Sequence, residues 1–331
     1  MSTHFLRNWL PALVILALGL GLPLVIESGF QLRLAMLICI YAVFGMGFNM
    51  LFGLAGQLSL GQQAFFAIGG YTFALLQIHY AVPWPLAMLA GAVVCAIVSL
   101  VIAVPVLRMR SHYLAMATLM FAMIVHDVAL RWTAVTGGSS GLQIPSPVLF
   151  GVRLGRLEIY YLILAIAVLA FLVQIFIKST HLGRALEAIK VDETAASSLG
   201  IPVNRYKTSI YVLAAVFAAV AGMSFAIVSR SVDPAYSTIG MVVNLLTLTV
   251  VGGLGSRIGP FLGAAIVILA PQLLAGLQEY ETLIYGVGLL LFIIFVPCGL
   301  AGLIERAGGA SNAGPAGTAL PVGSLPEAKN P

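Results

Sequence analysis

The sequence predicts an all-α polytopic membrane protein with about eight to ten transmembrane helices. Of its 331 residues, 61% are hydrophobic and only 8% are charged, whereas soluble domains carry roughly 25% charged residues. Runs of about 20 apolar residues, long enough to cross the hydrocarbon core of a bilayer, recur along the chain. This composition excludes a soluble enzyme, a disordered protein and a disulfide-stapled secreted module.

Ten apolar runs bounded by charged residues, glycine or proline supply the predicted spans. They cover residues 9–26, 32–52, 58–80, 84–107, 113–132, 158–177, 208–229, 239–254, 258–277 and 283–304. The first run has no convincing small-residue cleavage site, so we expect it to remain as an uncleaved anchor. Beyond Arg306 the chain is rich in glycine, alanine and proline. This change predicts a transmembrane domain over 1–306 and a disordered tail over 307–331.

Positive charge is distributed unevenly between the two sides of the predicted bundle. If both termini are cytoplasmic, that side carries eleven lysines and arginines and the other side carries five, which fits the positive-inside rule. The loop 178–207 then lies in the cytoplasm, and the longest outer loop is 133–157. The basic residues form no continuous face for nucleic acid, and contact with anionic lipid explains them better.

No residue pattern predicts a cofactor on this chain. The histidines lack metal-ligand spacing, and the cysteines Cys39, Cys95 and Cys298 lie in apolar runs where they are expected to be small buried hydrophobes. The sequence contains no Gly-Lys dipeptide, and hence no Walker A loop for ATP.

Glycine interrupts the chain at two places, 49–63 and 252–264. Each glycine weakens a helix by about 1 kcal/mol relative to alanine. Backbone groups freed at membrane depth need protein or a water-filled cavity around them. Paired breaks in the two halves of a chain point to a translocation path built from an internal repeat.

Two interpretations of these glycine-rich segments remain open, a translocation path and close helix packing. We assign to a path or gate the small and polar residues of the first segment, which are Asn49, Gly53, Gly56, Gln57, Ser59 and Gly61, followed by Gln62 and Gln63. The four-residue spacing of the second segment favours one smooth packing ridge, made of Gly255, Gly259 and Gly263.

The loop 178–207 contains the pattern of an amphipathic helix over 187–200. Small and apolar residues recur at steps of three and four, namely Ala185, Ala188, Ile189, Ala195, Ala196 and Leu199. Charged residues are spaced for i,i+3 pairs, namely Arg184, Glu187, Lys190 and Glu193. Gly200 supplies a C-terminal cap and Pro202 a stop. Such a helix suits docking into a groove on another protein, and a connector resting on the membrane is the alternative.

This loop resembles the coupling segment of bacterial ABC importer permeases, whose signature is Glu-Ala-Ala, three residues and Gly. Ala195, Ala196 and Gly200 match the signature, and Thr194 stands in the place of the first alanine, after Glu193. Together with GLAGQLSLGQQAFFAIGGY, TGGSSGL and GGLGSRIGPFLGAA, the loop resembles the branched-chain amino acid permeases of the longer, M-type subunit. Urea and short-amide permeases are similar in the same segments.

The resemblance implies a five-part importer in the bacterial inner membrane. Its parts are two unlike permeases, two cytoplasmic ATPases that bind ATP and Mg²⁺, and a periplasmic binding protein that delivers Leu, Ile or Val. This chain would be a transport subunit without catalytic residues. The residues that would transmit ATPase movement are Glu187, Glu193, Ala195, Ala196 and Gly200.

Two other classes of function stay open from the sequence. A stand-alone ion-coupled secondary transporter usually carries carboxylates inside its spans, and only Asp127 approaches that position here, where it is spaced to pair with Arg131. A channel or membrane scaffold would need no docking loop. The segment 137–141 fits the GxSxG pattern, but it lacks the strand-turn-helix context of a hydrolase. We expect an ordered turn there, and the resemblance adds a role near the substrate entrance or the binding-protein dock.

Overall fold

The computed structural model describes residues 16–17, 19–23, 28–107, 109, 111–149, 152–274, 286 and 299–302. Within these ranges five helices are long and apolar enough to cross a membrane, namely Gly29–Leu54, Trp84–Val106, Tyr113–Arg131, Arg156–Ser179 and Val203–Ser229. The prediction of an all-α polytopic membrane protein is confirmed.

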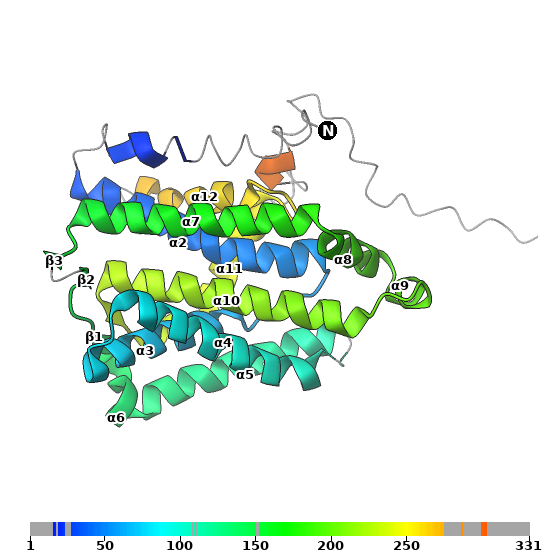
Figure 1. The fold of residues 1–331 in the computed structure, drawn as a ribbon, viewed down its shortest axis with the longest axis horizontal. Coiled ribbons are helices and arrows are strands. Elements are labelled where there is room, and N and C mark those ends of the chain that lie inside the picture. The colour runs from blue at the N-terminus through cyan, green and yellow to red at the C-terminus, as the bar shows by residue number, and fades with distance from the viewer. Residues whose placement is uncertain are drawn as a thin grey trace, which may run out of the picture.

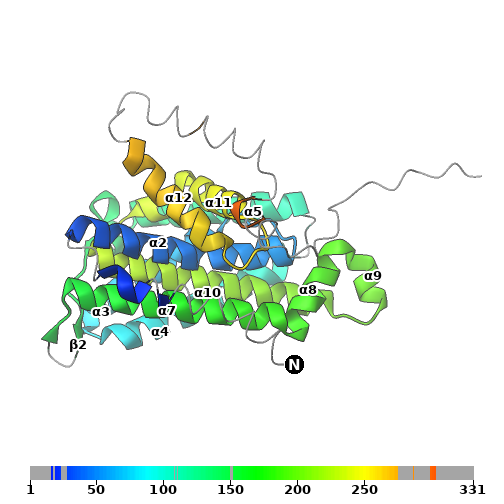
Figure 2. The same cartoon turned by 90° about the horizontal axis from the view of Figure 1, so that it is seen from above.

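The helices lie side by side in one bundle (Figure 1). In chain order the longer elements are α2 (Gly29–Phe48), a π-helix η1 (Asn49–Leu54), α3 (Gln62–Tyr80), α4 (Trp84–Val106), α5 (Ser111–Arg131), α7 (Arg156–Ser179), α8 (His181–Val191), α9 (Glu193–Ser198), α10 (Val203–Ser229), α11 (Ile239–Gly252) and α12 (Gly259–Leu274). Helices α11 and α12 pack against each other and against α2, as Figure 2 shows from above.

Short strands close one end of the bundle, which we call the β end. Strand β1 (Leu142–Gln143) pairs antiparallel with β4 (Ser231–Val232), and β2 (Val148–Leu149) pairs with β3 (Val152–Arg153). The one-turn helices α6 (Thr133–Thr136), η2 (Gly138–Ser140) and η3 (Pro234–Ser237) belong to the same end. The opposite end carries α8 and α9, and we call it the α8 end (Figure 1).

The core of the bundle is the contact of α10 with α3, and both helices also pack against α4. Two glycines allow this close approach. A Cβ at Gly222 of α10 would overlap the carbonyl of Phe66, and a Cβ at Gly69 of α3 would lie 2.7 Å from Ala219 Cα. Backbones therefore meet where other residues would hold the two helices apart.

The structure moves the ends of two of the predicted spans by a few residues. The predicted span 58–80 begins as α3 only at Gln62, because residues 55–61 form an irregular segment. The predicted span 239–254 is present as α11, which ends two residues earlier, at Gly252; its 14 residues cover about 21 Å of a hydrocarbon core about 30 Å thick. The predicted spans 9–26 and 283–304 lie mostly outside the described residues, and the predicted tail 307–331 lies wholly outside them.

Candidate functional site

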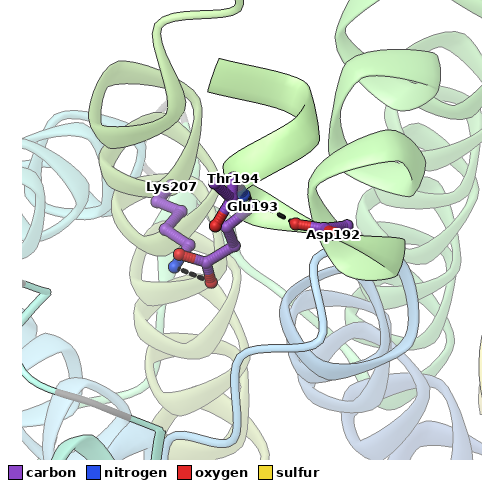
Figure 3. A network of polar contacts seen from close by, with 4 residues as sticks. All are labelled: Asp192, Glu193, Thr194 and Lys207. Carbon is purple, nitrogen blue, oxygen red and sulfur yellow. Dashed lines mark hydrogen bonds and ion pairs between the residues drawn. The ribbon is translucent and has the colours of Figure 1, made fainter. Parts of the chain in front are cut away.

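The predicted docking helix 187–200 is wrong as a single helix, because Asp192 divides it into α8 and α9. Asp192 is extended, with φ −156° and ψ 113°. Its Oδ1 accepts a hydrogen bond from Thr194 N at 2.8 Å (Figure 3) and another from Ala195 N at 3.0 Å. An aspartate that caps a helix in this way competes with continuation of the preceding helix. The pattern of apolar residues continues through Asp192, so periodicity alone did not reveal the break.

The charged residues of this loop bond to other elements. Glu193 forms an ion pair with Lys207 of α10 (Figure 3), and Lys190 donates a hydrogen bond to Gly53 O at 2.8 Å. Arg184 contacts His181 within α8. Lys190 and Glu193 therefore do not form the i,i+3 pair expected along one helix, because each bonds to a residue of another element.

Burial in the loop separates residues that support the fold from residues that face outward. Ala196 is 2% exposed and belongs to the core of this chain, so the expectation that it lies on a docking face is wrong. Ala195, Glu187 and Gly200 are exposed. Gly200 has φ +82°, as the predicted C-terminal cap requires.

The first glycine-rich segment begins as a π-helix at the α8 end. A π-helix is a rare, wide turn that occurs frequently at functional sites. Asn49 opens it and joins it to the second glycine-rich segment, because Asn49 Nδ2 donates to Ser256 O at 2.8 Å and Asn49 Oδ1 accepts from Gly255 N at 2.7 Å. The two breaks, 206 residues apart in sequence, therefore meet in space.

Two lysines bind the backbone at this meeting point. Lys190 of α8 donates to Gly53 O, and Lys178, near the end of α7, donates to Gly255 O. A Cβ at Gly53 would lie 2.6 Å from Gly255 N, so only glycine permits this approach. We call Asn49, Gly53, Lys178, Lys190 and Gly255 the glycine junction.

The remaining glycines of the two segments separate into turns and packing positions. Gly255 lies in the turn before α12 with φ +74°, so its inclusion in one helical ridge is wrong. Gly263 faces α11, where a Cβ would overlap the carbonyl of Leu248, and Gly259 begins α12 against the carbonyls of Gly253 and Gly252. Gly56 has φ +67° beside Lys190.

A buried polar segment follows the junction. Gly61 packs on the backbone of Thr118 in α5, and Leu60 N donates to Thr118 Oγ1 at 3.0 Å. The side chains of four neighbouring residues are buried, and within the described part of the chain each has at least one polar atom without a hydrogen-bond partner. They are Gln57, Ser59, Gln62 and Gln63.

The β end holds an open pocket of about 450 Å³ lined by residues that include His126, Ser140 and Asp233. His126 Nδ1 lies 2.9 Å from Pro234 O, so this nitrogen carries the proton that it donates. Burial raises the pKa of Tyr236 well above its ordinary value, and the protonated phenol donates to Ser231 O at 2.5 Å. The sequence TGGSSGL turns here as expected, with positive φ at Gly137, Gly138 and Gly141.

Two further expectations concern ionisable side chains. Asp127 and Arg131 are exposed on α5 and form no ion pair, although the structure describes both. Among the described residues, no group of His, Cys, Asp or Glu side chains has an arrangement that could hold a metal ion.

Comparison with known proteins decides the class of the chain. Residues 30–296 match the family model described as the branched-chain amino acid transport system permease component. The chain belongs to this family. This permease is 34% identical to the high-affinity branched-chain amino acid permease protein LivM of Salmonella typhimurium and to that of Escherichia coli, over 325 residues that cover 90% of this chain and 76% of each relative.

Two further high-affinity branched-chain amino acid permease proteins also match. The protein LivH of Escherichia coli is 25% identical over 291 residues, and BraD of Pseudomonas aeruginosa is 27% identical over 287 residues; each match covers 80% of this permease and 92% of the relative. No solved structure shows a significant match. Membership makes the chain a transport component rather than an enzyme.

Sequence reasoning missed four residues of this permease that the structure brings to the site. Three of them are lysines that the sequence places only as charged residues of the loop, namely Lys178, Lys190 and Lys207. No local sequence pattern predicts that a lysine binds a carbonyl or carboxylate far along the chain. Val191, at the end of α8, is 87% exposed, and Leu199, which directly follows α9, is 81% exposed. The sequence feature that could have indicated an exposed Val191 is its position directly before Asp192, the residue that caps α9.

Proposed function

We propose that this permease is the M-type membrane subunit of an ATP-driven importer for leucine, isoleucine and valine. Family membership over residues 30–296 and the named relatives support this function. A periplasmic binding protein delivers the amino acid, and a related H-type permease forms the other half of the membrane assembly, since both types of permease match the chain. The charge bias supports an inner-membrane orientation with both termini in the cytoplasm.

Two partner ATPases bind ATP and Mg²⁺ and dock on α8 and α9, and this chain binds no cofactor. Val191 and Leu199 offer exposed apolar side chains at the tip of the loop, where a partner groove gains affinity by covering them. The Asp192 cap and the ion pair of Glu193 with Lys207 hold α9 at a fixed angle to α10.

The glycine junction transmits ATPase movement to the membrane helices, and the bond between Lys190 and Gly53 O carries this proposal. Displacement of α8 moves Lys190 and therefore the end of the π-helix. Lys178 couples the end of α7 to the turn before α12 in the same way. ATP-driven closure thus shifts the population between inward-open and outward-open states through contacts that differ between the two states.

The buried polar segment after the junction forms the gate. Each buried polar atom without a partner costs about 1–3 kcal/mol. Gln57 and Ser59 lie in the irregular segment 55–61, and Gln62 follows it as the first residue of α3. Movement of the junction exposes these groups to a water-filled path that the amino acid crosses. Hydration of the same groups stabilises the open state.

The experiment combines ATPase pull-down with uptake of labelled leucine in membrane vesicles. Val191→Arg and Leu199→Arg, which alter exposed side chains, should reduce both bound ATPase and uptake. Val148→Arg is the matched control, because Val148 is a half-exposed valine at the β end. Full ATPase binding by both loop variants would reject α8 and α9 as the docking element. Full uptake without any copurifying ATPase would favour an ion-coupled transporter.

A further inference from the structure

A pocket of about 430 Å³ opens at the β end between the first turns of α2 and α7 and the last turn of α10. Three arginines line it, namely Arg33, Arg156 and Arg230, and no acidic residue does. All three are exposed. In the part of the chain that the structure describes, none of their guanidinium groups takes part in a hydrogen bond or ion pair.

Two of the three helix ends at the pocket add positive charge, and the C-terminus of α10, which carries a partial negative charge, is covered by its own cap residue Arg230. Helices α2 and α7 begin at Gly29 and Arg156, and a helix N-terminus carries a partial positive charge. The guanidinium group of Arg156 lies over the start of α2, because a Cβ at Gly29 would be 2.6 Å from its Nη1. The first turn of α2 has neither an acidic residue nor a side-chain cap.

The nearest acidic side chain on these helices is already engaged. Glu158 Oε2 accepts a hydrogen bond from Gly155 N at 2.7 Å and caps its own helix. Negative charges stabilise a helix N-terminus, so the arginines at the starts of α2 and α7 are unfavourably placed when no anion is bound. Arg33, Arg156 and the starts of α2 and α7 therefore gather positive charge that the C-terminus of α10 only partly offsets, and an anion bound between them would reduce the repulsion.

The lower part of the pocket is apolar. Met36 and Ile159 lie one helical turn below Arg33 and Arg156, and Ile227 lies beside them. Exposed apolar side chains continue from the mouth of the pocket, with Phe30 on α2 58% exposed and Leu157 on α7 53% exposed. A small free oxyanion would use only the arginines, whereas an anion attached to an apolar body would use both surfaces.

We propose that this pocket binds the phosphate headgroup of an anionic phospholipid, with an acyl chain lying against Phe30 of α2 and the exposed apolar residues of α7. The chemistry recognised is a phosphate oxyanion, which pairs with arginine in bidentate fashion. A lipid is favoured over the carboxylate of a partner protein because exposed apolar residues continue along α7, a helix long enough to span the membrane, at Leu157, Tyr161, Leu169 and Phe176.

The test compares lipid binding by the full-length chain in detergent. The probes are phosphatidylglycerol, phosphatidylcholine and inorganic phosphate, and the readouts are retained lipid by native mass spectrometry and the shift in melting temperature. Replacement of all three arginines by glutamine should lower phosphatidylglycerol affinity about fivefold per arginine, or on the order of 100-fold together. Phosphatidylcholine carries the same phosphate beside a choline cation that neutralises it, so it should bind more weakly and lose less affinity in the triple variant.

Arg131→Gln is the matched control, because Arg131 is an exposed arginine at the same end of the bundle, on α5. If the triple variant does not fold, Arg230→Gln alone should still lower the affinity about fivefold.

The proposal is overturned if the variants retain wild-type affinity, or if Arg131→Gln loses as much. Equal stabilisation by inorganic phosphate would assign the site to a free anion, and displacement of the lipid by a polyglutamate peptide would assign it to a protein. None of these readouts depends on the proposed transport function.

Discussion

Replacing Lys190 with methionine should uncouple α8 from the first glycine-rich segment. The Lys190 ammonium group lies 2.8 Å from Gly53 O, and methionine keeps an apolar stem while removing the donor. A hydrogen bond from a charged donor contributes about 1.5–3 kcal/mol. This bond is only partly buried, so solvent screening reduces the expected loss to about 1–1.4 kcal/mol. That energy corresponds to a factor of about 5–10 in the equilibrium that couples α8 to the gate.

The assay is uptake of labelled leucine per ATP hydrolysed, measured in proteoliposomes that contain the whole importer. Lys190→Met should lower this ratio by about 5- to 10-fold and leave the amount of bound ATPase unchanged, because Lys190 points toward the junction. Arg184→Met is the control, since Arg184 contacts His181 on the same helix. A wild-type ratio in Lys190→Met, or an equal loss in Arg184→Met, would refute transmission through the junction.

Three further expectations follow from the same contacts. Gly263→Val should lower the melting temperature through overpacking of about 1–3 kcal/mol or more against Leu248, while Gly240→Val, where a Cβ would make only an ordinary contact with Thr238 Oγ1 at 3.8 Å, should not; equal melting temperatures would contradict the close approach. Asp192→Ala should remove the cap of α9, worth about 0.5–2 kcal/mol, and weaken ATPase pull-down, whereas Asp192→Asn should retain it; unchanged binding by Asp192→Ala would show that α9 needs no cap. Cysteines placed at the exposed positions Ser198 and Ser140, without the native cysteines, should react with impermeant reagents from opposite faces of the membrane, and labelling from one face would overturn the topology.

Apolar run length and helix stops predicted the fold well, because both depend on local composition. The all-α class, the four predicted spans that became α4, α5, α7 and α10, and the Gly200 cap follow from residues close in sequence. The length of α11 did not follow, since its apolar pattern runs on to Leu254. The helix ends earlier, at Gly252, where the backbone turns to reach Asn49.

The sequence predicted the separate segments of the candidate site but not the contacts between them. The glycine-rich segments and the loop are visible as compositions, but their meeting depends on an asparagine and two lysines that bind backbone groups far along the chain. Such bonds leave no periodicity in the sequence. The burial of Ala196 was hidden for a related reason, because an alanine fits equally well on a docking face and inside a core.

The acceptors at the glycine junction are main-chain carbonyls, and this has a genetic consequence. Lys190 and Lys178 each donate a hydrogen bond to a main-chain oxygen, which every residue type possesses. No substitution at Gly53 or Gly255 can therefore turn this acceptor into a positively charged group. A charge-reversal defect at either lysine therefore cannot be suppressed by an opposite reversal at its partner. Suppressors should instead arise at positions that reposition the two helices, and their locations would map which parts of the bundle move together.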